Sequence, residues 1–328
     1  MRLDLIVGYA CNNNCIHCFN LDAIKALKAR GRPLDKSTEE IKSIITTMKR
    51  KYGIKEVVFT GGEPTIRRDF FELLEFAKSL GLKIGLQTNG RMFASEEFAK
   101  KVLEIDENIG FVIPVHHTSP RVHDAITQMK DSWKQTIKGI KNLVRFGAKN
   151  ICQKTVILKQ NFENLGELVN LAFRLEIKNI DFTFIQAGGN ATINWFKIAP
   201  RYSEIEGNLR NTIKLAEKLG ISVTTFGIPF CFLHGFEKYA FEIKECIEPY
   251  LTRGNLIRYS TKEENVINGL NIQRRVKVPR CKSCKFFYVC MGIWEDYVKF
   301  YGCEEFKPII GEKITSVKKF ETFLEAKV

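Results

Sequence analysis

Short apolar runs alternate with amphipathic stretches along residues 1–225. Runs rich in apolar or β-branched residues predict six β-strands, at 3–9, 56–60, 83–87, 110–116, 151–158 and 179–185. Apolar positions at helical spacing predict helices between them, at 38–51, 68–80, 95–103, 133–146 and 163–175. Strands that are each followed by a helix indicate a parallel α/β array, either open or closed into a barrel. Functional residues of such arrays lie at the carboxyl ends of the strands.

The pattern changes after residue 228, where the alternation stops. A helix at 203–219 and a short run at 222–225 complete the array, whereas a basic run at 25–32 predicts a surface loop. Residues 226–328 hold six of the ten cysteines and little periodicity apart from an amphipathic stretch at 313–328. We therefore expect two domains, the array at 1–225 and a small cysteine-rich C-terminal domain at 226–328 that metal holds together.

Composition narrows the class of protein. The chain of 328 residues is 45% hydrophobic and 27% charged, which excludes disordered and fibrous classes. It has no apolar stretch near 18 residues and no cleavage site after the first strand, so we expect a cytoplasmic protein without a membrane partner. The formal charge of +14 indicates either an anionic partner or a lysine-rich, thermally robust surface.

The cysteines at the N-terminal end form the sharpest pattern. Cys11, Cys15 and Cys18 make CxxxCxxC directly after the first predicted strand. In a reducing compartment, clustered thiols bind metal or take part in catalysis more often than they form disulfides. Three cysteines in one tight loop suit an iron-sulfur cube whose fourth iron stays open to a ligand. A zinc site that His17 or a distant residue completes is the alternative.

The segment GYACNNNCIHCFN resembles the signature of the radical S-adenosylmethionine (SAM) superfamily. The second predicted strand ends in TGGEP, which is similar to that family's loop for the amino group of SAM. Here Gly61 and Gly62 allow a close backbone approach, Glu63 offers an acceptor for an ammonium group, and Pro64 stiffens the turn. The resemblance implies a partial (β/α)6 TIM-like barrel and a [4Fe-4S] cluster that binds SAM.

Further candidates for SAM binding follow the later strands. Asn89 and Gly188 follow the third and sixth strands, where members of the family place groups that contact SAM, and His116, which ends the fourth strand, is a further candidate. His116 can equally be a histidine at the rim of the barrel that binds nothing. No residue is predicted to act as a catalytic acid, base or nucleophile.

The second cysteine group resembles the auxiliary-cluster extensions called SPASM and Twitch. Cys281, Cys284 and Cys290 make CxxCxxxxxC, and Cys303 follows after twelve residues. The resemblance implies one auxiliary [4Fe-4S] cluster on these four cysteines. A further SPASM cysteine would stand where this chain has Trp294, so a second auxiliary cluster is doubtful. A zinc knuckle on the same four ligands is the alternative.

Two cysteines stay unassigned in this interpretation. Cys231 and Cys246 are separated by fourteen residues, as two other SPASM ligands can be, but the glycine of that pattern is absent. They are either core thiols or partial ligands of a second cluster.

The resemblance implies an enzyme that takes an electron from a donor such as ferredoxin or flavodoxin and cleaves SAM reductively. The resulting 5′-deoxyadenosyl radical would abstract hydrogen from a peptide or protein. One alternative is a substrate that is tRNA, another RNA or a nucleotide-derived cofactor precursor, as in molybdopterin biosynthesis, and the basic charge favours it. The other alternative is a non-catalytic binding protein that zinc stabilises.

Overall fold

The computed structural model describes residues 1–242, 256–259 and 274–325. Of residues 256–259 it describes the backbone alone. Cys246, one of the two unassigned cysteines, lies outside the described residues.

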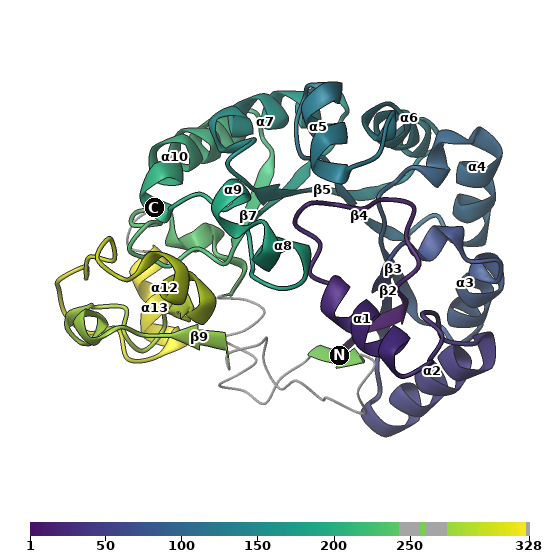
Figure 1. The fold of residues 1–328 in the computed structure, drawn as a ribbon, viewed down its shortest axis with the longest axis horizontal. Helices are drawn as coiled ribbons and strands as arrows, with labels where there is room; N and C mark the ends of the chain where they lie inside the picture. Colours follow the sequence, from purple (N-terminus) through teal and green to yellow (C-terminus); the bar gives the residue numbers. More distant parts are fainter. Residues whose placement is uncertain (243–255, 260–273, 326–328) are drawn as a thin grey trace.

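One parallel sheet forms the centre of the molecule (Figure 1). Its strands are β1 (Arg2–Gly8), β2 (Glu56–Gly61), β3 (Lys83–Gln87), β4 (Gly110–Pro114), β5 (Asn150–Ile157), β6 (Asn179–Phe184), β7 (Ser222–Phe226) and β8 (Leu256–Tyr259). They follow the order β7-β6-β5-β4-β3-β2-β1-β8, so β7 and β8 are the two edges and the sheet stays open. The expected partial TIM-like barrel is confirmed, with the six predicted strands present. The sequence pattern did not predict β8, which pairs with β1.

Helices cover the outside of the sheet (Figure 1). They are α2 (Thr38–Tyr52), α3 (Phe70–Ser79), α4 (Glu96–Ile105), α5 (Pro120–Thr127), α6 (Ser132–Arg145), α7 (Leu165–Arg174) and α10 (Tyr202–Lys218). Helix α2 begins as predicted, because the Ser37 side chain accepts a hydrogen bond from the backbone N–H of Glu40 (3.1 Å). Leu3 and Leu5 of β1 and Val57 of β2 are fully buried between the sheet and these helices.

Three further helices lie inside this ring in the view of Figure 1: α1 (Leu21–Ala29), α8 (Asn190–Ile193) and α9 (Trp195–Ile198). Helix α1 corrects the expectation of a surface loop at 25–32, because residues 25–29 are helical. Leu21, Ile24 and Leu27 recur at helical spacing there, and the intervening Ala and Lys residues are strong helix formers. The basic character of the run hid this periodicity.

The C-terminal segment packs beside the barrel rather than over its outer helices (Figure 1). It contains a two-stranded antiparallel ribbon and two helices: β9 (Arg275–Val276), β10 (Ile293–Trp294), α12 (Glu295–Tyr301) and α13 (Val317–Glu325). The Tyr297 ring lies 4.6 Å from that of Tyr202 on α10, and the Phe300 ring stacks on Trp195 of α9 at 5.1 Å. These aromatic contacts join α12 to the barrel. The domain division at residue 225 stays a prediction.

No helix in the described part of the chain combines the length and the apolar character that crossing a membrane requires.

Candidate functional site

The N-terminal cysteines Cys11, Cys15 and Cys18 lie in one loop, residues 9–20, that joins β1 to α1; we call it the cysteine loop. It follows the carboxyl end of β1 and crosses this edge of the sheet (Figure 1, dark purple). Helix α5 holds its middle, since the carbonyl oxygens of Thr127 and Ile126 accept hydrogen bonds from the N–H groups of Asn14 (3.0 Å) and Ile16 (2.9 Å). The barrel therefore holds the middle of the loop in place.

The turn between β6 and α8 holds the other side of the cysteine loop. Asn190 donates from its backbone N–H to the carbonyl oxygen of Cys18 (2.8 Å) and from Nδ2 to that of Cys15 (3.0 Å). Asn194 Nδ2 donates to the carbonyl oxygen of Ile16 (3.0 Å). These bonds fix the backbone on both sides of His17, and so the directions of two thiols.

Glycine is required in this turn at position 189. Gly189 has φ +53° and ψ −127°, a combination that disfavours any residue with a Cβ, and an added Cβ would lie 2.7 Å from the carbonyl oxygen of Cys18. Gly188, a predicted SAM contact, also has a positive φ (+150°) and abuts Phe19, where an added Cβ would lie 3.2 Å from the Phe19 Cβ. This turn meets the cysteine loop through its backbone.

We expect Gly189→Ala to lower the free energy of unfolding by about 1–3 kcal/mol, because Ala must adopt a strained backbone and displace Cys18. Iron bound by the loop should also pass faster to a chelator. Gly207→Ala is the matched control: Gly207 is exposed in the middle of α10 with nothing near its Cβ position, so Ala should raise stability by up to about 1 kcal/mol. Urea unfolding and timed chelation measure both effects. Equal stability of the two variants would contradict this account of the turn.

The residues after β3 hold the start of the cysteine loop. Asn89, a predicted SAM contact, donates from Nδ2 to Asn12 Oδ1 (2.6 Å). The Arg91 guanidinium donates to the carbonyl oxygen of Asn12 and to Asn13 Oδ1, the latter at 2.8 Å. Arg91 was not among the residues predicted from the sequence. Its place just beyond the carboxyl end of a strand is the only signal that could have found it.

The GGEP loop, residues 61–64, packs on the chain that enters the cysteine loop. The N–H groups of Gly62 and Glu63 donate to the carbonyl oxygens of Gly8 and Ala10, both at 2.8 Å. An added Cβ on Gly62 would lie 2.1 Å from the Ala10 oxygen, so only glycine allows this approach. Asn20 Nδ2 donates to the carbonyl oxygen of Gly61 (2.8 Å), which joins the other end of the cysteine loop to the same turn. The two motifs that the sequence paired are thus neighbours in space.

The Glu63 carboxylate is buried and bonded to the protein. Its Oε1 accepts hydrogen bonds from the hydroxyls of Thr65 (2.6 Å) and Thr88 (2.7 Å), and its Oε2 accepts one from the N–H of Asn89 (2.6 Å). Burial raises the pKa of Glu63, and these hydrogen bonds oppose the rise. Glu63 therefore ties the end of β2 to the end of β3. Its role as an acceptor for the SAM ammonium stays a prediction.

A buried histidine, His116, lies against the His17 ring of the cysteine loop. The His17 ring, between two of the cysteines, meets the His116 ring edge to face at 4.7 Å, and neither Nδ1 has a hydrogen-bond partner. Burial lowers the pKa of His17 to about 4 and that of His116 well below its usual value, so both rings are neutral at pH 7. His116 therefore supports the loop from below. Its predicted contact with SAM is untested.

The electrostatics of the three thiols indicate that they share one small region. Burial, together with the smaller effect of the charges of Cys18 and Cys11, raises the pKa of Cys15 to about 12. Partial desolvation raises the pKa of Cys11, which keeps contact with solvent, to about 11, while the nearby Arg91 cation opposes the rise. An iron-sulfur cluster fits this donor set, because bound iron stabilises the thiolates that burial disfavours.

No three His, Cys, Asp or Glu side chains within the described ranges converge closely enough to hold a single metal ion. A cluster makes a different demand on its ligands, because each cysteine binds a separate iron.

The cysteines of the C-terminal segment are distributed unevenly. Cys281 lies in a short 3-10 helix, η7 (Pro279–Ser283), and Cys284 and Cys290 follow it. These three line a cavity of about 30 Å³ together with Cys231, which comes from the segment after β7. Cys303, the fourth predicted ligand, is not among the lining residues. The structure therefore brings together three of the four predicted auxiliary ligands.

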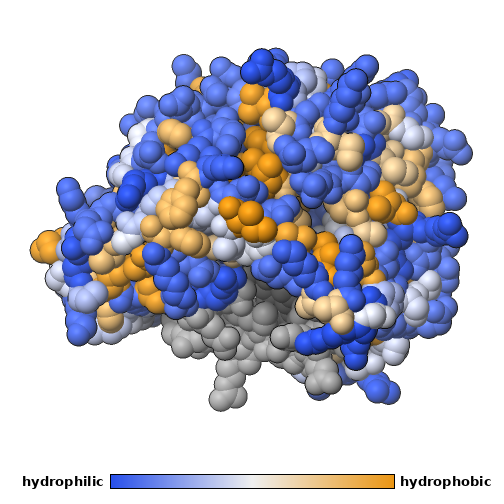
Figure 2. All heavy atoms as spheres, in the orientation of Figure 1, coloured by the Kyte–Doolittle hydropathy of each residue, from blue (hydrophilic) through white to orange (hydrophobic). Residues whose placement is uncertain are grey.

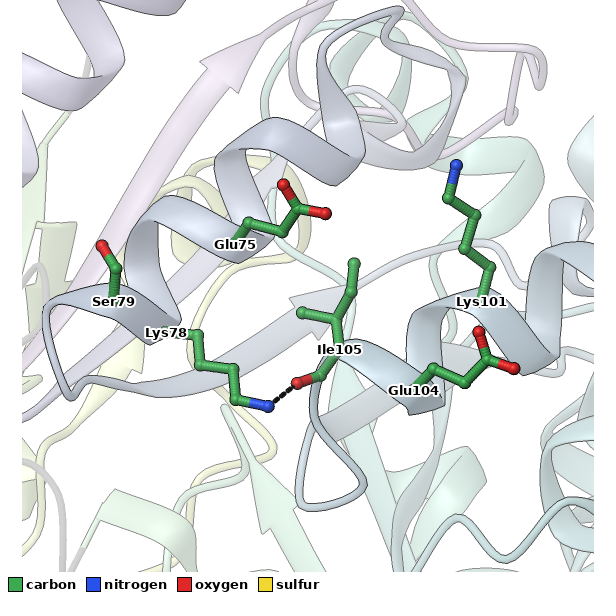
Figure 3. Close-up of a pocket in the computed structure, with 6 residues that line it drawn as sticks. All are labelled: Glu75, Lys78, Ser79, Lys101, Glu104 and Ile105. Carbon is green, nitrogen blue, oxygen red and sulfur yellow. Dashed lines mark hydrogen bonds between the residues drawn. The ribbon is translucent and has the colours of Figure 1, made fainter.

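A larger groove, about 510 Å³ in volume, lies between α3 and α4 (Figure 3). Lysine and glutamate side chains line it, and Lys78 Nζ donates to the backbone oxygen of Ile105 at its base. Ser79 and Ile105 end their helices just before β3 and β4 begin, so the groove lies at the amino edge of the sheet. The cysteine loop lies at the carboxyl edge, and the groove holds none of the predicted site residues.

Apolar side chains are exposed on the cysteine loop and beside it. Phe19, directly after Cys18, is 61% exposed, and Ile193 and Phe196 on α8 and α9 are 67% and 61% exposed. Figure 2 shows apolar side chains gathered among hydrophilic ones over the face that carries these elements. This part of the surface offers contacts to a ligand with apolar groups.

Several known proteins resemble the chain in sequence. Mycofactocin maturase MftC of Mycolicibacterium smegmatis is 29% identical over 194 residues, which are 58% of this chain and 46% of the relative. A probable GTP 3′,8-cyclase of Sulfurisphaera tokodaii is 26% identical over 211 residues, 63% of either protein. The aligned part thus spans less than two thirds of these relatives.

Solved structures share the fold over nearly the whole chain. Streptococcus suis SuiB bound to S-adenosylmethionine has a TM-score of 0.64 at 16% identity, over 96% of this chain and 76% of SuiB. The protein anSMEcpe with bound AdoMet and Cp18Cys peptide has a TM-score of 0.62 at 14% identity, over 99% of this chain and 96% of its own. The family model of the radical SAM superfamily matches residues 5–172. Because this match takes in half of the chain, including the cysteine loop and the GGEP loop, the protein belongs to the radical SAM superfamily.

Proposed function

We propose that the protein cleaves SAM reductively and uses the resulting 5′-deoxyadenosyl radical to abstract hydrogen from a peptide or protein. One observation carries the proposal: a loop with three cysteines is fixed against the GGEP loop at the carboxyl edge of a partial barrel. This is the edge at which α/β arrays place their chemistry.

The residues of the chain act by holding and enclosing the reactants. Cys11, Cys15 and Cys18 would hold the cluster, which supplies the electron for cleavage of the carbon-sulfur bond of SAM. Asn190, through its two hydrogen bonds to the cysteine loop, fixes the directions of the ligands. The neutral ring of His116 backs the loop with a group that adds no charge. The GGEP loop and Asn89 border the space where SAM would bind.

Three observations support a peptide or protein substrate. A mycofactocin maturase is among the relatives, and SuiB with its precursor peptide SuiA has a TM-score of 0.64 to this chain. Exposed apolar side chains of Phe19, Ile193 and Phe196 lie next to the cysteine loop. Peptide side chains would find both apolar and polar contacts there.

A nucleotide is the second candidate substrate. The probable GTP 3′,8-cyclases among the relatives and the formal charge of +14 favour it, because a basic surface attracts phosphate groups. Three further proposals hold for either substrate. The protein is cytoplasmic, and it takes its electron from a donor such as ferredoxin or flavodoxin. Its domains are residues 1–225 and 226–328.

Anaerobic reconstitution with iron and sulfide tests the proposal. We expect about eight irons per chain for two [4Fe-4S] clusters, and 5′-deoxyadenosine after reduction in the presence of SAM. A protein that binds zinc without iron and leaves SAM intact would be a binding protein instead. To identify the substrate, the reduced protein is incubated with SAM and peptides encoded by neighbouring genes, and mass spectrometry measures the peptide masses. A parallel reaction contains GTP instead of a peptide. A changed peptide mass supports the lead, and consumption of GTP supports the second candidate.

A further inference from the structure

The cavity in the C-terminal segment brings together cysteines that are far apart in sequence. We call it the auxiliary cavity; it is lined by Cys231, Cys281, Cys284 and Cys290 with apolar and lysine side chains. Cys231 precedes the other three by 50 residues or more. The electrostatic interactions agree, because the charges of Cys290, Cys281 and Cys284 all act on the Cys231 thiol. Four thiols therefore face one small volume.

Cys231 is firmly placed in this cavity by its neighbours. The Phe230 ring stacks on Phe320 at 5.4 Å and meets Phe286 edge to face at 5.3 Å. On the other side, Phe232 stacks on Tyr202 at 5.4 Å. The backbone amide of Phe230 also lies against the Cys290 sulfur and favours its thiolate. Aromatic contacts thus anchor the chain on both sides of Cys231.

Cys303 lies in a different environment. Its N–H donates to Glu304 Oε2 (2.9 Å), and its sulfur is 4.0 Å from Glu304 Oε1. It lines no part of the auxiliary cavity, although Phe306 three residues later does.

The walls of the auxiliary cavity suit an anionic metal centre. Phe286, Phe287 and Ile293 keep the interior apolar, and Lys277 and Lys307 bring positive charge to it. Four thiolates around a [4Fe-4S] core carry net negative charge, which nearby lysines stabilise.

We propose that Cys231, in place of Cys303, is the fourth ligand of the auxiliary cluster, together with Cys281, Cys284 and Cys290. The proposal rests on the proposed function, since a radical SAM enzyme makes a cluster the expected occupant. The proposal differs from the prediction made from the spacing of the cysteines, which groups Cys303 with Cys281, Cys284 and Cys290. It also means that the cluster would join the segment after β7 to the C-terminal segment.

Iron counting in a background without the N-terminal cluster tests the proposal. The full chain with Cys11→Ala, Cys15→Ala and Cys18→Ala should hold about four irons after anaerobic reconstitution. Adding Cys231→Ala should lower the iron content at least twofold and change the electron paramagnetic resonance spectrum of the reduced cluster. Adding Cys303→Ala should leave both unchanged. Loss of iron with Cys303→Ala but not with Cys231→Ala would overturn the proposal, as would zinc in place of iron.

Alkylation of the reconstituted wild-type protein gives an answer that does not depend on the folding of a variant. Mass spectrometry after brief iodoacetamide treatment should find Cys303 modified before and after a chelator removes the iron. Cys231 should be modified only after removal. Protection of Cys303 by the cluster would overturn the assignment. If the wild type forms 5′-deoxyadenosine and only these results fail, the ligand assignment is wrong and the proposed function stands.

Discussion

Cys15→Ala should abolish the formation of 5′-deoxyadenosine, with a loss well beyond the roughly 100-fold that residues supporting a metal ligand can cause. Cys15 is the central cysteine of the loop, and its thiol is the part that iron would bind. The hydrogen bonds of this residue that hold the loop involve its carbonyl oxygen, which accepts from Asn190 Nδ2 and from the N–H of Cys18. Alanine keeps these bonds, so the variant should fold while its iron content falls from about eight to about four.

Cys152→Ala is the matched control for this experiment. Cys152 is a half-buried free cysteine on β5, and its thiol interacts with Asp181 and Lys154 rather than with another cysteine. Iron content and 5′-deoxyadenosine formation should match the wild type. Chromatography of the anaerobic reaction, with dithionite as reductant, measures the product. Undiminished product from Cys15→Ala would refute the assignment of the cluster to this loop.

Arg275→Ala should lower the free energy of unfolding by about 3–5 kcal/mol, because it leaves a buried carboxylate without its partner. Arg275 on β9 lies 3.0 Å from Glu242 Oε1, and both side chains are only 4% exposed. The guanidinium also lies over the Trp294 ring, 3.9 Å from its centroid. Glu242 Oε1 accepts a second hydrogen bond from the N–H of Gly227, at the end of β7 (2.6 Å). The pair therefore joins β9 to the chain that leaves the barrel.

Arg274→Ala separates the effect of burial from the loss of an arginine. Arg274 pairs with Asp296 at 2.5 Å, but its side chain is 43% exposed, so its removal should cost at most about 1 kcal/mol. Urea unfolding of the iron-free protein, followed by circular dichroism, measures both variants. Similar losses of unfolding free energy for the two variants would show that the buried pair stabilises the protein no more than the exposed pair does.

The fold could be predicted from the sequence to the extent that burial leaves a local pattern. Strands such as β2 and β5 are buried on one or both faces, and apolar or alternating runs mark them. Helix α1 has no buried residue, and its lysines, with the arginines that follow it, hid its weak apolar spacing. Strand β8 lies in a segment without clear periodicity, and only pairing with β1 defines it.

The residues of the candidate site likewise include some that a local sequence pattern reveals and others that it does not. Spacing within one loop revealed Cys11, Cys15 and Cys18, because their geometry is local. Arg91 acts through contacts with a loop nearly 80 residues earlier, and an arginine after a strand has many ordinary uses. Cys231 approaches the other cysteines only through the packing of Phe230 and Phe232. When the ligands of one site come from distant segments, the sequence contains no fixed spacing that could reveal them.

The pairing of β8 with β1 matters while the protein is being synthesised, because the two strands are far apart in the chain. Gly8 and Leu256 are separated by roughly 250 residues, which a ribosome adds in about 10–50 s at 5–20 residues per second. During that interval the outer edge of β1, the strand that leads into the cysteine loop, has no partner from its own chain. Unpaired strand edges are templates for aggregation, so the nascent barrel is most vulnerable at the strand that is synthesised first.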